Sequence, residues 1–418
     1  MDNYQVQVNS EIGELQGVIV HSPGKEVENM TPKNAERALY SDILNLSVAQ
    51  KEYSHFKNAI AKHSPVFEIK DLLQEVLNNQ RVRETLIDHI FSNENPMTSK
   101  HYLLSLPDEE LSRQLLEGVI LVRDNLTKYF SKERYAIRPL HNFFFTRDAS
   151  MAVRDKVLIG RMASQVRGRE SLIMQAIFDY HPMFRTQTVN PTQHANFNDK
   201  ITIEGGDVLV AREDVLLIGT GTRTSSQGID FIFEQIESKD QVRHIIVQEL
   251  PESPESFIHL DMVFTFLDKN KCMVFEPIIM KPNRYQTVHI TIDNGKVKIK
   301  NEENIVECLN NLGFDLEPVY CGGTKDTWVQ EREQWHSGAN FFALAPGKVI
   351  GYGRNVYTIE ELNKHGFDVL SAEDVATGKT DISQYDKYVI AVDGSELPRG
   401  GGGARCMTMP FSRKPVSW

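Results

Sequence analysis

One sequence pattern recurs, and it limits the folds open to the chain more than any other feature. In each copy a short apolar run leads to a tight polar turn and then to a second apolar run, as in a β-hairpin. Four copies occur, at residues 148–161, 207–219, 259–275 and 339–352. Helix-like segments such as residues 169–178 come next, followed by a further strand, as at residues 244–248. The sequence therefore predicts a repeated α/β supersecondary unit.

The two ends of the chain would supply a fifth hairpin. Apolar runs lie at residues 15–21 and 404–409. Pairing these runs would close the repeats into a ring and remove exposed sheet edges. Reactive residues at equivalent strand ends would then meet near the central axis. The alternative is a two-layer α/β domain whose hairpins only look alike.

Residues 71–135 depart from the repeat, because they lack strand-like runs and show helical spacing. One apolar stripe contains Leu72, Leu73, Val76 and Leu77, and a second contains Leu111, Leu115, Val119 and Leu126. Pro107 followed by acidic residues suits the first turn of a helix. We expect residues 1–70 to begin the repeat fold, residues 71–135 to form a helical insertion, and residues 136–418 to complete the catalytic domain.

Charge and composition argue against several classes of function. The formal net charge of −11 argues against a nucleic acid partner. No apolar run approaches the roughly 20 residues that cross a bilayer, and no secretory signal is visible, so no membrane partner is expected. The 4 cysteines form neither a CxxC pair nor a disulfide framework, which predicts reduced thiols in a cytoplasmic protein. Assembly into a homo-oligomer is left open.

Cys406 has the most unusual surroundings of the four cysteines. Residues 400–403 are all glycine, and Arg399 and Arg405 flank them. Such a run disfavours a regular strand and indicates close backbone approach to a ligand or a loop that moves. A thiol placed there beside Arg405 is a candidate nucleophile. The alternative is a buried cysteine on the last strand.

Four acidic and basic residues complete a candidate site. His259 and Asp261 are one residue apart, so on a strand both side chains would point to the same face. Glu204 precedes two glycines and could support the histidine. Asp148 and Asp261 would repel each other unless a cation lay between them, and a planar guanidinium offers matched bidentate hydrogen bonds to both. A guanidinium substrate follows only if these two residues share one site.

A metal site is the competing interpretation of these residues. Its ligands would be His259, Asp261, Asp207 and Cys406. The set lacks tight ligand spacing and a second nearby histidine, so we expect no metal.

The ordered set of segments resembles the arginine deiminases of the guanidino-group-modifying superfamily. The similarity extends over nearly the whole chain, including residues 10–15, 21–26, 166–170, 332–335, 338–340 and 406–418. The resemblance implies a five-bladed pseudo-symmetric α/β propeller of ββαβ units with a small helical insertion. It also implies hydrolysis of free L-arginine to L-citrulline and ammonia, without cofactor or metal.

The resemblance also implies roles for individual residues. Cys406 would attack the guanidinium carbon, and Asp148 and Asp261 would hold the guanidinium nitrogens. His259 would protonate the departing ammonia and then activate water, while Glu204 would orient and charge His259.

Four further residues would bind or enclose the substrate. By position in matching motifs, Asn142, Arg167 and Arg223 would bind the α-carboxylate of the substrate. Arg399 and the glycines after it would form a gate.

Three other functions stay open at this point. An amidinotransferase would use the same cysteine but transfer the amidino group to an amine. A deiminase of an arginine relative such as agmatine would have no use for the carboxylate-binding arginines, so Arg167 and Arg223 argue against agmatine. A catalytically silent guanidine-binding protein is disfavoured because all five predicted catalytic residues are present.

Overall fold

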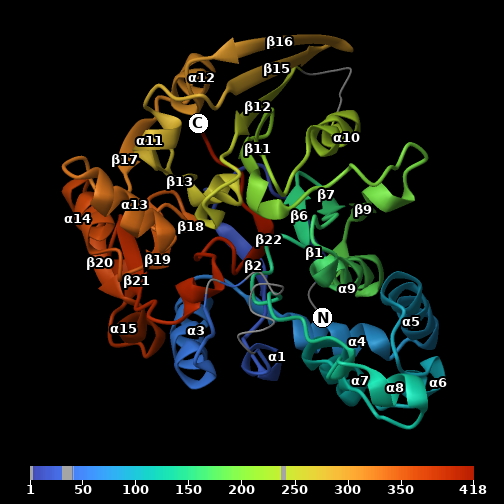
Figure 1. Ribbon diagram of the computed structural model, residues 1–418. Helices are drawn as coiled ribbons and strands as arrows, with labels where there is room; N and C mark the ends of the chain where they lie inside the picture. Colours follow the sequence, from blue (N-terminus) through green and yellow to red (C-terminus); the bar gives the residue numbers. More distant parts are fainter. Residues whose placement is uncertain (1–2, 31–39, 41, 237–241) are drawn as a thin grey trace.

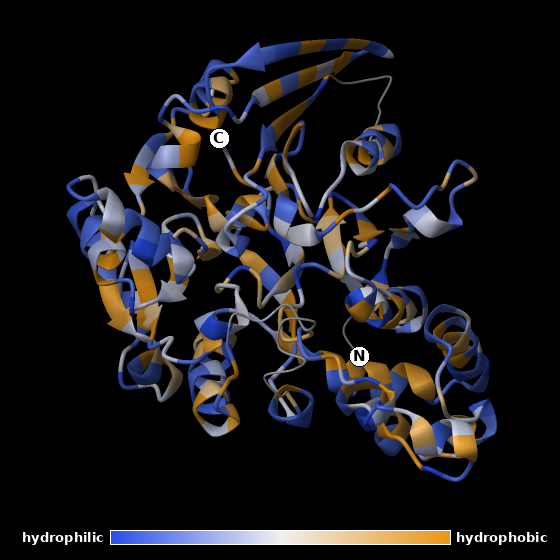
Figure 2. Ribbon diagram, viewed as in Figure 1, coloured by the Kyte–Doolittle hydropathy of each residue, from blue (hydrophilic) through white to orange (hydrophobic). Residues whose placement is uncertain are grey.

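The computed structural model describes residues 3–30, 40, 42–236 and 242–418, and these form a mixed α/β fold (Figure 1). The strands of this part of the chain make seven sheets. Apolar residues concentrate on the strands, whereas the outward faces of the surrounding helices are largely polar (Figure 2). This is the distribution expected when helices cover sheets and leave one face to water.

All four expected hairpins are present as antiparallel pairs. They are β6 (Ser150–Val153) with β7 (Lys156–Ile159), β10 (Val208–Arg212) with β11 (Val215–Thr220), β13 (Phe264–Asp268) with β14 (Lys271–Val274), and β18 (Phe342–Ala345) with β19 (Lys348–Tyr352). The second strand of each hairpin also pairs in parallel with a later strand. The later strands are β9 (Gln187–Val189), β12 (Arg243–Glu249), β17 (Glu317–Tyr320) and β21 (Tyr388–Val392).

A helix lies between hairpin and parallel strand in each unit, as a parallel connection requires. These helices are α9 (Gly168–Tyr180), α10 (Ser226–Ile236), α12 (Ile305–Asn311) and α14 (Val356–Lys364). The predicted helix at residues 169–178 and the predicted strand at residues 244–248 are both confirmed. The repeated unit is therefore ββαβ.

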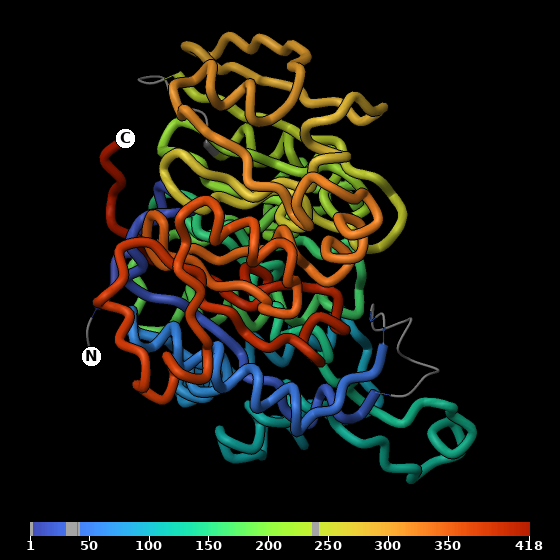
Figure 3. Tube along the Cα trace, turned by 90° about the vertical axis from the view of Figure 1, so that its left-hand side faces the viewer, coloured from blue at the N-terminus to red at the C-terminus, as the bar shows by residue number. Residues whose placement is uncertain are grey.

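The two ends of the chain form a fifth unit, as predicted. Strand β2 (Leu15–Val20) pairs antiparallel with β22 (Met409–Arg413) and parallel with β3 (Val66–Glu68). Helix α3 (Leu46–Ala61) connects β2 to β3. The N- and C-terminal ends lie on the same side of the molecule (Figure 3). The predicted strand at residues 404–409 is wrong in its bounds, because β22 begins only at Met409.

Several elements extend these units. Strands β15 (Thr287–Asp293) and β16 (Lys296–Glu302) add to β12, which gives a five-stranded sheet with β16 at its edge (Figure 1). Strand β20 (Asp368–Ser371) pairs with β21, and β1 (Tyr4–Gln5) pairs with β8 (Phe184–Arg185). Among the described residues, the remaining α-helices outside residues 69–137 are α1 (Lys25–Glu28), α11 (Glu276–Ile279), α13 (Thr327–Trp335) and α15 (Ala372–Ala376).

The region predicted to be helical contains five helices and one small sheet. The helices are α4 (Ile69–Leu77), α5 (Gln80–Glu94), α6 (Lys100–Leu104), α7 (Asp108–Glu117) and α8 (Leu126–Phe130). The stripe that begins at Leu72 is buried on α4, as predicted. The expectation that the region lacks strands is wrong, because β4 (Val119–Ile120) pairs with β5 (Tyr135–Ile137).

The second predicted stripe, which begins at Leu111, does not lie on one continuous helix. Gly118 follows α7 with a φ of 89°, a backbone conformation that favours glycine and ends the helix. Val119 therefore lies in β4, and Leu126 on α8 is 69% exposed. Among the described residues, no helix combines the length and apolar character that a membrane crossing requires.

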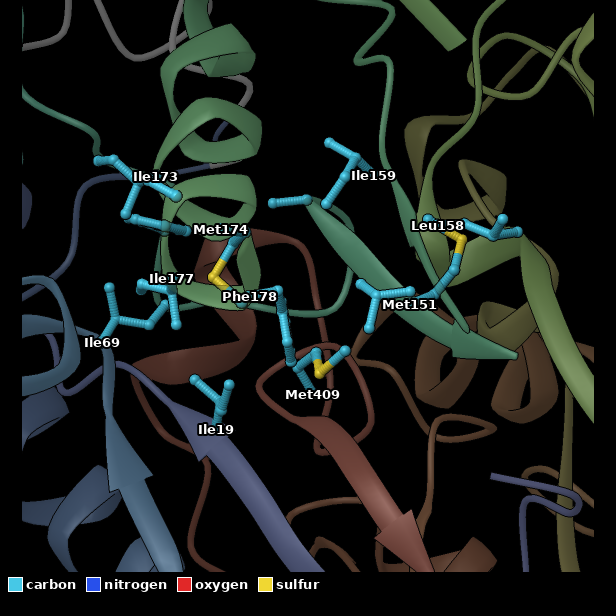
Figure 4. Close-up of a cluster of buried hydrophobic side chains, with 14 of the residues drawn as sticks. Ile19, Ile69, Met151, Leu158, Ile159, Ile173, Met174, Ile177, Phe178 and Met409 are labelled. Carbon is cyan, nitrogen blue, oxygen red and sulfur yellow. The ribbon is translucent and has the colours of Figure 1, made fainter. Parts of the chain in front are cut away.

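A shared core joins segments that are far apart in the sequence (Figure 4). Ile19 of β2 and Met409 of β22 belong to the same buried cluster as Met151 of β6 and Ile177 of α9. Ile69 of α4 also belongs to it, so the helical region is packed against the repeat units. This core fixes the two chain ends beside the first hairpin, near the residues described next.

Candidate active site

The five predicted catalytic side chains are buried and lie at equivalent places in four ββαβ units. Asp148 precedes β6, Glu204 precedes β10, His259 and Asp261 precede β13, and Cys406 precedes β22. Each is at most 4% exposed. Direct contacts join Asp148, Glu204 and His259, and also Asp261 and Cys406, while electrostatic interactions link the two sets into one cluster.

His259 forms the centre of a charged group. Its Nε2 lies 2.8 Å from Oε2 of Glu204, and its Nδ1 lies 3.7 Å from Oδ1 of Asp148. Burial alone would lower the pKa of His259, but the Asp148 and Glu204 carboxylates raise it to about 9. His259 is therefore protonated at neutral pH.

Glu204 remains ionised despite its complete burial. Its Oε1 accepts a hydrogen bond of 2.9 Å from the backbone N–H of Ala163, and Nη1 of Arg223 lies 3.8 Å from the same oxygen. Burial opposes the charge, but the hydrogen bond with His259 and the nearby Arg223 lower the pKa of Glu204 to about 2. The pair is consequently a carboxylate with an imidazolium.

The two glycines after Glu204 allow the close packing of this group. A Cβ at Gly206 would lie 2.5 Å from Nδ1 of His259, so only glycine leaves room for the ring. The backbone N–H of Gly206 donates to Oδ1 of Asp148 at 3.2 Å. Asp207 accepts a 2.9 Å hydrogen bond from the backbone N–H of Leu260 and so fixes the segment that contains His259.

The predicted strand containing His259 and Asp261 is wrong. Residues Leu260–Met262 form a 3-10 turn, and β13 begins only at Phe264. The alternation of a strand therefore does not explain why both side chains face the cluster. The turn directs His259 to Glu204 and Asp261 to Cys406.

Cys406 lies in a turn before β22, among polar groups. Its Sγ is 3.7 Å and 3.9 Å from the two carboxylate oxygens of Asp261 and 3.2 Å from Nδ2 of Asn340. Burial and the negative charges of Asp261 and Asp148 raise the pKa of the Cys406 thiol well above its ordinary value. With no cation bound, the thiol is therefore protonated.

Comparison with known proteins identifies the family. The sequence model of the arginine deiminase family matches residues 36–413. An arginine deiminase from Bacillus cereus is 34% identical over 436 residues, which cover 99% of this chain and 100% of that protein. The chain belongs to the arginine deiminase family. An arginine deiminase from Oenococcus oeni is 30% identical over 428 residues, with 98% of each chain covered.

Two solved structures resemble this arginine deiminase family member in fold. One is an amidinotransferase of the saxitoxin biosynthetic pathway from Microseira wollei, with a TM-score of 0.51, 14% identity, and coverage of 99% of this chain and 98% of that chain. The other is the inosamine-phosphate amidinotransferase of Streptomyces griseus, with a TM-score of 0.50, 13% identity, and coverage of 98% and 97%. At these identities the likeness shows a shared mixed α/β fold and nothing about substrate.

In this family member, Arg405 holds Asp261 in place through a buried ion pair. Its Nη1 donates to Oδ2 of Asp261 at 2.8 Å, and its other nitrogens donate to both oxygens of Glu11 at 2.9 Å and 3.1 Å. Burial works against both charges, but the ion pair lowers the pKa of Glu11 to about 2. Sequence reasoning gave Glu11 no role. Its only signal was its place in the segment 10–15 that resembles the family.

Asn340 also contacts Cys406, and the sequence analysis assigned it no role. Its Oδ1 accepts hydrogen bonds from the backbone N–H groups of Arg405 and Cys406, at 2.8 Å and 3.4 Å. Its Nδ2 donates to the backbone oxygen of Asp261 at 3.0 Å. Asn340 precedes β18, so the remaining ββαβ unit also contributes a side chain to the cluster.

Arg167 lies in the cluster, where it binds two carboxylates of the chain itself. Its Nη1 donates to Oδ2 of Asp148 at 2.7 Å, and its Nε and Nη2 donate to Glu170 at 2.8 Å to 3.1 Å. Burial raises the pKa of Glu170 to about 7 against the opposing effect of Arg167. The predicted role of Arg167 in binding a substrate carboxylate stays a prediction.

The other predicted substrate-binding residues differ in how exposed they are. The Arg223 side chain is 14% exposed and lies beside Glu204. The Asn142 backbone oxygen lies 3.5 Å from Nη2 of Arg167. Arg399 lies at the surface, where its side chain is 42% exposed and pairs with Asp42.

Three side chains of the cluster are close enough to hold a metal ion. Donor atoms of Asp148, Glu204 and His259 lie within 4.8 Å of one another. Glu204 and His259 bind each other, however, and Arg167 is paired with Asp148. The expectation that the site works without a metal stays a prediction.

The charge of Glu204 should control the titration of His259. We expect Glu204→Gln to move the His259 titration from about pH 9 to lower pH, because the carboxylate stabilises the imidazolium. Nuclear magnetic resonance of histidine-labelled protein measures this shift. Glu75→Gln removes a carboxylate beside His181 and should leave the His259 titration in place.

The same pKa predicts a pH dependence of stability. Because the folded-state pKa exceeds the ordinary value of 6.5, the stabilisation from His259 is fully present below pH 6.5 and is lost as the pH rises through about 9. If the His259 titration were unchanged in Glu204→Gln, the explanation of its raised pKa by the Glu204 carboxylate would be contradicted, and with it the pH dependence of stability.

Proposed function

We propose that the chain is a hydrolase that converts free L-arginine to L-citrulline and ammonia through a covalent intermediate on Cys406. The observation that carries the proposal is a buried cluster in which a thiol lies beside the Asp261 carboxylate and a protonated histidine lies beside the Asp148 and Glu204 carboxylates. Membership of the arginine deiminase family supports the same reaction.

The carboxylates select a permanently charged planar group. Asp261 lies beside Sγ of Cys406, and Asp148 adds negative charge to the same space. A guanidinium between them would receive charge-assisted hydrogen bonds and offset the repulsion between the carboxylates. Its positive charge would also favour loss of the thiol proton to solvent. Substrate binding therefore generates the nucleophile.

The first chemical step forms a bond between Sγ of Cys406 and the guanidinium carbon. As the bond from this carbon to a terminal nitrogen breaks, the nitrogen takes the proton of His259 and departs as ammonia. The product of this step is an S-alkylthiouronium on Cys406. Glu204 keeps His259 protonated before the step and oriented during it.

The second step hydrolyses this intermediate. His259, now neutral, accepts a proton from a water molecule as the water oxygen bonds to the same carbon. The bond between that carbon and Sγ then breaks as the remaining hydroxyl proton passes to the departing sulfur, which releases the ureido group of citrulline and restores the Cys406 thiol. Apart from the thiol proton lost to solvent when substrate binds, the proton transfers use His259 and Cys406.

Asn142, Arg167 and Arg223 are proposed to bind the α-carboxylate of arginine. Arg223 is the strongest candidate of the three for binding the α-carboxylate, because it lies beside Glu204 and its side chain is partly exposed. Arg167 would have to share its hydrogen bonds between the substrate and Glu170. Arg399, with the glycines that follow it, is proposed to cover the bound substrate.

We further propose that the five ββαβ units are blades of a five-bladed pseudo-symmetric propeller. The support is that each unit places a side chain of the cluster just before its first strand or, at the chain ends, before β22. Residues 71–135 would be a helical insertion between the propeller segments 1–70 and 136–418. Residues 31–39 and 41 of the first segment lie outside the described residues.

The direct test is turnover by the purified chain. We expect ammonia and citrulline in equal amounts from L-arginine, and no turnover by Cys406→Ser, because a serine hydroxyl is a much weaker nucleophile than a thiolate. Cys272→Ala removes a buried thiol of β14 and is the matched control that should retain activity.

Three outcomes would contradict the proposed reaction. Ammonia release from agmatine or a methylated arginine but not from arginine would overturn the substrate. Transfer of the amidino group to an added amine would identify an amidinotransferase. Full activity of Cys406→Ser would overturn the mechanism.

The role of Arg223 predicts a difference between two substrates. We expect Arg223→Met to lower kcat/KM for arginine at least about 10-fold more than for agmatine, because only arginine has the carboxylate that a charge-assisted pair would hold. Arg284→Met removes an exposed arginine and should change neither value. Equal losses for the two substrates would show that Arg223 acts through Glu204 instead.

A further inference from the structure

A second group of metal-binding side chains lies at the outer edge of the five-stranded sheet. His289 is on β15, Glu302 ends β16, and Cys308 is on α12. Figure 1 shows these three elements together at the periphery, and β15 and β16 are at the opposite end of the sheet from β10. One donor atom of each residue lies within 4.8 Å of the others.

The strand pairing explains why these side chains meet. His289 pairs with Lys300 across the two strands, and Glu302 is two residues beyond Lys300, so His289 and Glu302 share one face of the sheet. Helix α12 packs on β16 and on β12 and brings Cys308 to this face. The His289 and Cys308 side chains are buried, and Glu302 is partly buried.

The His289 ring already has the hydrogen bonds of a metal ligand. Its Nδ1 lies 3.1 Å from Oε1 of Glu302, and its Nε2 lies 2.9 Å from Nδ1 of His244 on β12. Metal-binding histidines usually donate their second ring N–H to a fixed acceptor, which sets the tautomer. His244 provides that acceptor if Nδ1 of His289 is the nitrogen that binds the ion.

We propose that His289, Glu302 and Cys308 form a binding site for a divalent cation of the zinc class. Imidazole, thiolate and carboxylate together are ligands that Zn²⁺ accepts, whereas Mg²⁺ and Ca²⁺ prefer oxygen ligands alone. Water would fill the fourth position.

Binding requires three changes at the site. Ligands of a tetrahedral zinc lie about 3.3 to 3.7 Å apart. Nδ1 of His289 and Oε1 of Glu302 are already 3.1 Å apart, so only donor atoms separated by up to 4.8 Å must approach, by about 1 Å. The Cys308 thiol and Nδ1 of His289 lose their protons, the first to solvent and the second by exchange to the tautomer protonated at Nε2. Nζ of Lys300 lies 2.6 Å from Oε1 of Glu302 and must move away, which its half-exposed side chain permits.

A cation bound at this site would stabilise the edge of the sheet. Strand β16 is almost entirely exposed, and an exposed edge strand is prone to fraying and to pairing with other chains. An ion bound by β15, β16 and α12 would cross-link the edge strand to its neighbour and to the covering helix. The site shares no residue with the cluster around Cys406, so its effect would be on stability and not on chemistry.

Cobalt is the probe for the proposed site, because a cobalt–thiolate bond gives a charge-transfer absorption band. The parent is the full chain with Cys406→Ser, which removes the thiol of the other cluster. We expect the band in this parent and in the parent with Cys272→Ala, and its loss in the parent with Cys308→Ser. Zn²⁺ should raise the Tm of the parent and not that of the Cys308→Ser variant.

Two further variants, at partly buried Glu302 and exposed Lys300, provide a readout that does not depend on substituting the fully buried Cys308. Glu302→Gln should weaken Co²⁺ binding at least about 10-fold, a loss typical even of residues that only support a ligand. Lys300→Gln removes the competing cation and should strengthen binding. Absence of the band in the parent, its persistence after Cys308→Ser, or unchanged affinity in both of these variants would overturn the proposal.

Discussion

The buried guanidinium of Arg405 connects the parts of the chain on which the site depends. It binds Glu11 near the N-terminus and Asp261 before β13, while the adjacent residue in the sequence is Cys406. Removing one partner of such a buried pair typically costs about 3 to 5 kcal/mol, because the other charge is left unpaired in a dry environment. Cys406 and the carboxylate beside it are thus held in register by the ion pairs of Arg405.

Asp148 and Asp261 place negative charge near the Cys406 thiol, although each carboxylate is paired with a buried arginine. Arg167 binds Asp148, and Arg405 binds Asp261. The same negative charge that protonates His259 also keeps Cys406 from ionising. A bound guanidinium would reverse the second effect. In the proposed mechanism the acid is therefore ready before substrate arrives, and the nucleophile is formed only when substrate binds.

The sequence predicts the repeated hairpins well, because apolar runs around a polar turn depend on local chemistry. The pairing of the chain ends is also predictable, since it follows from counting the repeats. The turn at Leu260–Met262 is not predictable from the sequence. It is held by a hydrogen bond from the backbone N–H of Leu260 to Asp207, a residue of another ββαβ unit. Roles for Glu11 and Asn340 were missed for the same reason: their partners are about 394 and 66 residues away in the sequence. The proposed cation site likewise depends on the register of β15 and β16, which the sequence pattern did not reveal.

The covalent intermediate on Cys406 is the claim on which the proposed mechanism depends. Rapid acid quenching of the chain with arginine labelled at the guanidinium carbon, followed by peptide mass spectrometry, tests it directly. We expect the label to appear on the peptide that contains Cys406 before citrulline accumulates, and to disappear as arginine is exhausted. Citrulline formation with no label on Cys406 at any time, or with label on a different residue, would contradict the account.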